Sequence, residues 1–218
     1  MTRPSTSHSS SSYESSSSAG STICTPTSAS GLGARKIHFN PHSDWDFIAA
    51  TDSEPVDLDL LLPHYRAVNQ PRTHRLSMYV HSRHGEVKAK VCRTSRAAPF
   101  LLSVHAPSGA PVTLYLPSDF AGTIRLPVRP AKLALSAGFT NAIQPRVMLA
   151  GAPRREGEEA YDMDEVEVYA PGPVTLRMWD VCEGTPERAA REAWRKLCRA
   201  TSKRDLGRAG DWDFLLDD

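Results

Sequence analysis

The side chains of this chain that could perform chemistry are its histidines, and their spacing favours neither catalysis nor a metal centre. His81 and His84 lie around a predicted turn, while His38 and His42 are four residues apart near the start of the predicted fold. Three converging imidazoles could bind zinc and leave one coordination position open. Histidines on an exposed turn are far more often simple polar turn residues, so we expect no metal ion and no cofactor.

The cysteines and the known catalytic motifs give no stronger indication of chemistry. Cys24, Cys92, Cys182 and Cys198 are scattered without a C-x-x-C pair, which is neither a disulfide framework nor a zinc-ligand spacing. The chain lacks G-x-S-x-G, the phosphate-binding G-x-x-x-x-G-K-[ST], H-E-x-x-H and a strand-linked G-x-G-x-x-G. We therefore expect reduced thiols, no catalytic residues and no enzymatic activity.

Length and charge limit the class of protein. The 218 residues can bury one sizeable core, so one domain with tails is expected. Because 26 basic and 25 acidic residues leave a net charge of +1, net charge does not favour nucleic acid or an anionic membrane as a partner. No segment approaches the roughly 20 apolar residues of a membrane span, and no secretory leader is recognisable. The expected location is intracellular, in the cytoplasm.

The first 33 residues are rich in Ser and Thr and contain almost nothing apolar. Such a segment cannot offset the entropy lost on ordering, so residues 1–33 are predicted to form a disordered tail. The tail is either an inert solvated segment or a platform for phosphorylation, since each phosphate would add about two negative charges.

The chain elements that would position any site are strands. Period-two alternation, β-branched residues and Gly or Pro turns predict a β-repeat domain over residues 34–184. Each unit has a strand, a turn and a second strand, which we interpret as a β-hairpin. Gly85, Gly109 and Gly172 lie in these turns, and at least two of them are expected to have positive φ.

The units recur at a nearly constant spacing. Val56, Val87, Val112, Ile143 and Val174 are equivalent points, with spacings of 31, 25, 31 and 31 residues, and Ile143 marks the weakest copy. Repeated units of this length pack either as hairpins in a sandwich or as a short β-solenoid. The predicted fold class is therefore mainly β, as a sandwich or a short β-solenoid, with one C-terminal α-helix.

Two charged or polar segments accompany the repeats. Residues 151–165 carry many acidic and basic side chains, among them Asp164 and Glu165, and are predicted to form a solvated surface loop. Residues 185–200 are predicted to form the C-terminal helix, with Thr185 as N-cap and Pro186 at the first helical position. Its apolar stripe would dock on the sheet.

The last segment, residues 201–218, is predicted to be a flexible acidic tail. It contains four apolar residues flanked by aspartates, which is typical of a short linear motif that binds a protein partner. The alternative is a strip that packs back on its own domain. The candidate interaction residues are Trp212, Phe214, Leu215 and Leu216.

Two features also resemble a known group of proteins. These are the pattern S-x-x-G-x-V-x-φ-x-φ, in which φ is an apolar residue, and the segment 116–124 with its Leu-Pro-x-x-Phe-x-Gly sequence, behind a serine-rich N-terminus. They resemble an uncharacterised agaricomycete fungal family with a domain of unknown function, distantly similar to adhesin-like β-repeat domains. The resemblance covers residues 36–182. It implies a fungal, intracellular, β-rich protein without assigned activity or catalytic residues.

Taken together, these observations favour a non-enzymatic β-scaffold that binds a protein partner through its C-terminal tail. The alternative is a small-ligand or carbohydrate-binding β domain, for which Trp45, Tyr65, Tyr79 and Tyr115 could provide a stacking surface. An enzyme ranks third. The sequence does not predict an oligomeric state.

Overall fold

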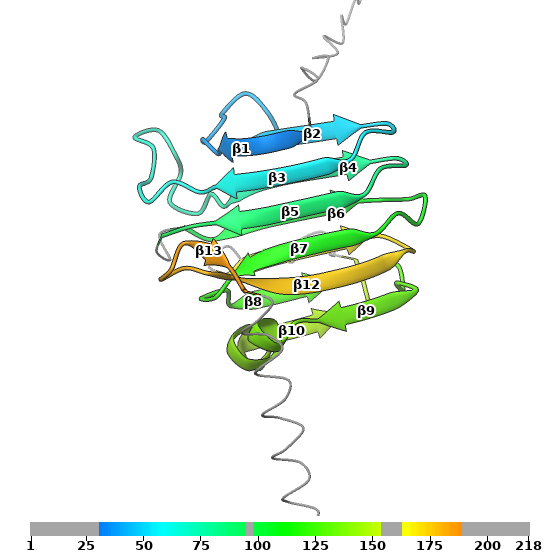
Figure 1. The fold of residues 1–218 in the computed structure, drawn as a ribbon. Coiled ribbons are helices and arrows are strands. Elements are labelled where there is room, and N and C mark those ends of the chain that lie inside the picture. Colours follow the sequence, from blue (N-terminus) through cyan, green and yellow to red (C-terminus); the bar gives the residue numbers. More distant parts are fainter. Residues whose placement is uncertain (1–30, 95–97, 154–162, 189–218) are drawn as a thin grey trace, which may run out of the picture.

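The fold consists mainly of β-strands arranged in two sheets (Figure 1). A computed structural model describes residues 31–94, 98–153 and 163–188. The first sheet contains β1 (Leu32–Lys36), β3 (Val56–Leu61), β5 (Val87–Cys92), β7 (Val112–Pro117), β9 (Lys132–Leu135), β12 (Pro173–Asp180) and β13 (Thr185–Pro186). The second sheet contains β2 (Phe47–Thr51), β4 (Leu76–Ser82), β6 (Phe100–His105), β8 (Gly122–Arg125), β10 (Val147–Ala150) and β11 (Asp164–Tyr169).

The chain alternates between the two sheets from β1 to β9. Each strand from β3 to β7 pairs in parallel with the strand two before it, and the only antiparallel pairing among the described residues joins β12 to β13. The predicted hairpins are therefore wrong, because the short Gly turns lead from one sheet into the facing one. Period-two alternation shows that one face of a strand is buried, but it does not identify the neighbouring strand.

The predicted repeat register is confirmed in the first sheet for four of its five points. Val56 lies opposite Val87, Val87 opposite Val112, and Val112 opposite Val174. Ile143 is not a fifth copy: it is the last residue of a short π-helix, η1 (Phe139–Ile143), and Leu133 of β9 takes the place beside Val174.

The final pair of strands is inserted into the stack rather than added to its end. β12 lies between β7 and β9, and β11 lies between β6 and β8, with β10 outside β8. Figure 1 shows β1 and β2 at one end of the stack and β9 and β10 at the other. The strands at the far end, β8, β9 and β10, therefore precede β11 and β12 in the sequence, although β11 and β12 lie nearer the middle of the stack. Val112 and its neighbour Val174 are consequently far apart in sequence.

A single apolar core fills the space between the sheets. The inward positions of the first sheet carry residues such as Leu58 and Leu114, and those of the second carry residues such as Met78 and Leu102, all fully buried. Complete burial of one such side chain stabilises the fold by about 1.5–3 kcal/mol. The outward positions of the same strands are mostly polar or aromatic, and they supply the surfaces considered below.

Only Gly109 of the three turn glycines has a positive φ, at +85°. The prediction that at least two of them have positive φ is therefore wrong. A Cβ at Gly85 would overlap the backbone of Glu54, and a Cβ at Gly172 would overlap the backbone of Gly109. Successive turns therefore stack so closely that two of these positions exclude a side chain by contact, not by dihedral angle.

The helical segment of the described chain comprises η1 and the 3-10 turn η2 (Gln144–Arg146), not the predicted C-terminal helix. Thr185 and Pro186 form β13 instead, because the chain turns back at Gly184 (φ +61°) and pairs with the end of β12. Residues 189–200 of that predicted helix lie outside the described residues. At the other end, β1 begins at Leu32, two residues before the expected start of the domain.

Candidate functional site

Five aromatic and imidazole side chains gather on the outer face of the second sheet. Tyr79, His81, His105 and Tyr169 project outward because they alternate with buried core residues of β4, β6 and β11. His81 lies opposite His105, and His105 opposite Tyr169, so three neighbouring strands present one row of rings. Trp45 extends the group from the segment before β2. We call these five partly exposed residues the aromatic surface.

The rings of the aromatic surface form a continuous chain of contacts. The centroids of Trp45 and Tyr79 are 5.4 Å apart, those of Tyr79 and His105 are 5.0 Å apart, and those of His105 and Tyr169 stack at 4.3 Å. The first two distances fall in the range at which aromatic pairs attract one another, and the stacked His105–Tyr169 pair is slightly closer. The surface is therefore preorganised, since its side chains hold one another before any ligand arrives.

Burial influences the titration of three side chains of the aromatic surface. Burial, with a further contribution from His81, lowers the pKa of His105 below its ordinary value. Burial raises the pKa of Tyr79, and burial with the nearby Glu167 raises that of Tyr169. Imidazoles and phenols can stack and exchange hydrogen bonds with a partner.

Two polar atoms of the aromatic surface differ in their partners. Nε2 of His105 lies 3.1 Å from the hydroxyl of Ser103. Nδ1 of His81 is buried and has no hydrogen-bond partner in the described part of the chain. Leaving a buried nitrogen without a hydrogen-bond partner costs free energy of folding.

The sequence identified part of the aromatic surface. Of the four predicted stacking residues, Trp45 and Tyr79 come together here. Tyr115 lies on the outer face of the other sheet below the guanidinium of Arg177, and Tyr65 lies in the segment after β3.

His105 and Tyr169 were missed, although the repeats contained the signal. Each directly follows a strand valine, Val104 or Val168, as His81 follows Val80. Aligning the second-sheet strands on these valines would have placed His81, His105 and Tyr169 in one row.

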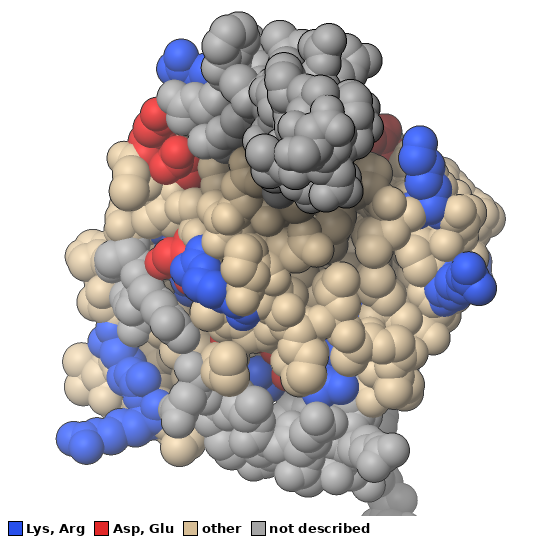
Figure 2. Space-filling model, turned by 90° about the horizontal axis from the view of Figure 1, so that it is seen from below, with Lys and Arg blue, Asp and Glu red and all other residues tan. Residues whose placement is uncertain are grey.

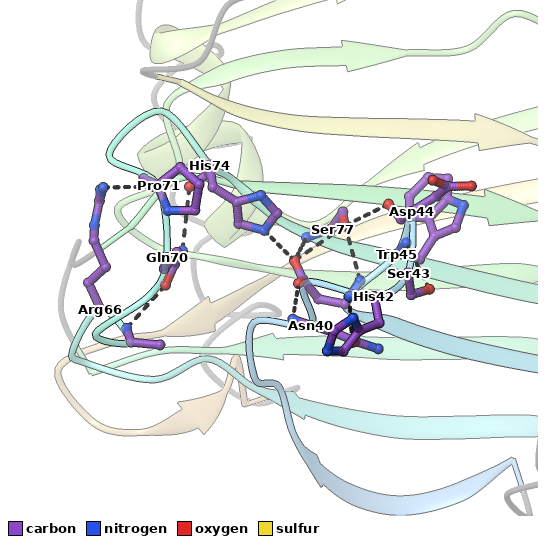
Figure 3. A network of polar contacts seen from close by, with 12 residues as sticks. Asn40, His42, Ser43, Asp44, Trp45, Arg66, Gln70, Pro71, His74 and Ser77 are labelled. Atoms are coloured by element: carbon purple, nitrogen blue, oxygen red, sulfur yellow. Dashed lines mark hydrogen bonds and ion pairs between the residues drawn. The ribbon is translucent and has the colours of Figure 1, made fainter.

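A second polar group, to which Asn40, His74 and Ser77 in Figure 3 belong, surrounds the buried carboxylate of Asp46. The carboxylate accepts hydrogen bonds from the backbone N–H groups of Asn40 (2.7 Å) and Ser77 (2.8 Å) and contacts Nε2 of His74 at 2.8 Å. The hydroxyl of Ser77 lies 3.3 Å from the carboxylate and 3.4 Å from the carbonyl oxygen of Asp44. In a nucleophilic triad the imidazole stands between serine and carboxylate. Here the carboxylate stands in the middle, so this group fixes the segment before β2 against β4.

The four histidines considered as metal ligands do not converge. His81 belongs to the aromatic surface, and His84 lies in the turn after β4, where its N–H donates to the carbonyl of Asp52. His42 and His38 lie in the segment after β1. No group of three His, Cys, Asp or Glu side chains within the described ranges is arranged to hold a metal ion.

The predicted surface loop at 151–165 ends in a buried ion-pair cluster instead. Asp164 and Glu165 are the first residues of β11 and are 2% and 4% exposed. Arg93 binds Asp164 through two hydrogen bonds of 2.9 and 3.1 Å, and Glu165 contacts Arg75 at 2.9 Å and Arg125 at 2.7 Å. The prediction of a solvated loop is wrong for Asp164 and Glu165, because charge density alone does not show which acids have buried partners. Residues 154–162 of that loop lie outside the described residues.

The charges of this cluster stabilise one another. Burial disfavours the charged guanidinium, but the hydrogen bonds and charges of Asp164 and Asp119 outweigh burial and raise the pKa of Arg93. Arg93 directly follows β5, and Asp164 is the first residue of β11. Their ion pair therefore ties the inserted strand β11 to a segment that is distant in sequence.

The end of the stack at β9 and β10 is mainly uncharged. Figure 2 views the molecule from this end, where most of the described surface is neither acidic nor basic. Met148 and Leu149 of β10 are among the exposed apolar side chains. The predicted interaction residues Trp212, Phe214, Leu215 and Leu216 lie outside the described residues, so they remain a prediction.

Comparisons with known proteins give a family but no activity. Within the described ranges, no helix is both long and apolar enough to traverse a membrane. No curated protein and no solved structure matches the chain. A domain of unknown function, DUF7330, matches residues 47–180, which is more than half of the chain and lies inside the region of the expected resemblance. The chain therefore belongs to the DUF7330 family.

Proposed function

We propose that the protein is a non-enzymatic interaction scaffold and that the aromatic surface is its contact area for a protein partner. The observation that carries this proposal is the row of partly exposed rings across β4, β6 and β11. Tyr and Trp are enriched among the residues that dominate binding energy at protein interfaces. Rings that already contact one another lose little side-chain freedom on binding, which favours affinity.

Several further features support a binding role over catalysis. The His74–Asp46 contact has the carboxylate, not the imidazole, beside the serine hydroxyl. The aromatic surface lies on the face of a sheet, which suits a macromolecule better than a small substrate. A net charge of +1 makes a protein partner a better proposal than nucleic acid.

We also propose that the stack is a short β-solenoid and that the protein acts in the cytoplasm. Alternation of the chain between two parallel sheets, with in-register valines, supports the first proposal. Cys92 and Cys182 are free thiols, which is compatible with a reducing compartment. The fungal origin and the distant similarity to adhesin-like repeats remain expectations from the resemblance.

Affinity capture with matched variants tests the proposed interface. The Tyr79→Ala/Tyr169→Ala variant removes two outward rings, and Tyr115→Ala removes one ring from the outer face of the other sheet as a control. Partners retained by the wild type and by the control should be retained at least about tenfold less by the double variant, as expected for interface residues that each contribute about 2 kcal/mol. Thermal melts must show that the three proteins are folded. Equal retention by the double variant would refute the interface.

A further inference from the structure

A pocket separate from the aromatic surface lies where the chain leaves β1 and β3. Its volume is about 340 Å³, and it is lined by two segments, residues 36–38 and 61–65. The N–H of Ile37 donates to the carbonyl oxygen of Leu61 at 3.0 Å, so the two segments are joined behind the pocket. Small-molecule sites usually measure about 300–1,000 Å³, which places this pocket at the small end.

The floor and the rim of the pocket differ in chemistry. The floor is apolar, with Ile37 only 1% exposed and Leu61 and Leu62 partly buried. The rim carries Lys36, His38, His64 and Tyr65, and none of the lining residues is acidic. The pocket therefore combines an apolar body with groups that donate hydrogen bonds and positive charge.

Two of the basic side chains of the rim have no partner within the described ranges, whereas the ring of His64 contacts that of Tyr65 at 5.2 Å between centroids. In the described part of the chain, neither Lys36 nor His38 has a hydrogen-bond or ion-pair partner for its side chain. The lysines of β5 contrast with this, because Lys88 and Lys90 contact Asp57 and Asp59 at 2.8 and 2.6 Å.

Register explains the difference between these lysines. Lys36 lies opposite Leu61 on the neighbouring strand, whereas Lys88 lies opposite Asp57 and Lys90 opposite Asp59. The two outward lysines of β5 thus have acidic partners on the neighbouring strand, whereas Lys36 lies beside an apolar residue next to the pocket.

We propose that this pocket binds a small organic carboxylate with an apolar body, of the size and type of benzoate. The apolar part would cover Leu61 and Leu62, and the carboxylate would accept hydrogen bonds from the ammonium of Lys36 and from the imidazole of His38 or His64. Charge-assisted hydrogen bonds of this kind are stronger than neutral ones. This site is independent of the protein interface proposed above.

Titration of the full chain with benzoate, followed by amide NMR, tests the pocket. Benzamide serves as the neutral probe of nearly the same shape. We expect saturable shifts confined to residues 36–38 and 61–65 with benzoate, and binding of benzamide weaker by about fivefold or more, as for the loss of one exposed charge interaction. Equal binding of both probes, shifts spread over the surface, or no saturation would overturn the proposal.

Two lysine variants distinguish the loss of charge at the pocket from the loss of a positive charge elsewhere on the surface. Lys36→Gln removes the rim charge, and Lys132→Gln removes an exposed lysine of β9 at the other end of the stack. Benzoate affinity should fall about fivefold in the first variant and stay unchanged in the second. Equal affinity for benzoate in both variants would show that Lys36 does not bind the anion, whatever the outcome at the aromatic surface.

Discussion

Substituting Asp164 by Asn tests how the inserted strand is held in the stack. Asp164 is the first residue of β11, and its side chain and that of Arg93 are 1% and 2% exposed. Its two carboxylate oxygens accept hydrogen bonds from both terminal nitrogens of Arg93, at 3.1 and 2.9 Å. The same oxygens lie 3.4 Å from the backbone nitrogens of Phe100 and Ala121. The variant keeps the shape of this group but leaves a buried guanidinium short of its counter-charge.

The expected loss of stability is large for a change so conservative in shape. Removing one partner of a buried ion pair costs about 3–5 kcal/mol, because the remaining charge stays buried without compensation. Asp119 still contacts Arg93 at 2.9 Å, which places the estimate at the lower end, about 3 kcal/mol. For a domain of this size the melting temperature should then fall by roughly 6–12 °C.

Denaturant unfolding, with Asp119→Asn as the matched control, measures this effect. Asp119 contacts the same arginine but is 29% exposed, so water can replace much of its interaction. We expect a loss of about 1 kcal/mol in the control, near the value for partly exposed pairs. A loss below about 1 kcal/mol for Asp164→Asn, or an equal loss in both variants, would refute the view that this pair locks β11.

Three further predictions concern a turn, the aromatic surface and the thiols. Gly109→Val should cost about 1–3 kcal/mol in chemical denaturation, because valine is strained at a φ of +85°, and unchanged stability would contradict the turn geometry. His81→Ala should raise the pKa of His105 in an NMR titration, since one neighbouring imidazolium is removed while burial still lowers that pKa; no change would show that the two rings do not interact. At pH 8 iodoacetamide should modify exposed Cys182 and spare Cys92, whose pKa burial raises to about 12, and rapid labelling of Cys92 in the folded protein would disprove its burial.

Strand positions and repeat register could be predicted from sequence, but strand pairing could not. The valines at 56, 87, 112 and 174 carry the repeat because each lies at the start of a strand of the first sheet, as its first or second residue, with its side chain in the core. Alternation specifies which face is buried, and it is the same for a hairpin and for a turn between facing sheets. The insertion of β11 and β12 depends on contacts between distant segments, for which one sequence contains no local signal.

The candidate site was only half predictable for a similar reason. Trp45 and Tyr79 were recognised as aromatic residues with a possible role, whereas His105 and Tyr169 acquire theirs from parallel neighbours. The buried acids were missed because Asp164 and Glu165 follow a run of charged residues in the sequence. Their arginine partners come from segments far away in the chain, so only the folded structure shows the pairing.

Oxidative footprinting of a captured complex tests the proposed interaction surface most directly. Tyrosine side chains are labelled according to their accessibility, so the free protein and the complex can be compared residue by residue. The account predicts that the partner protects Tyr79 and Tyr169, which lie on the aromatic surface, and leaves Tyr115 on the opposite face unchanged. Protection of Tyr115 without protection of Tyr79 and Tyr169 would contradict it.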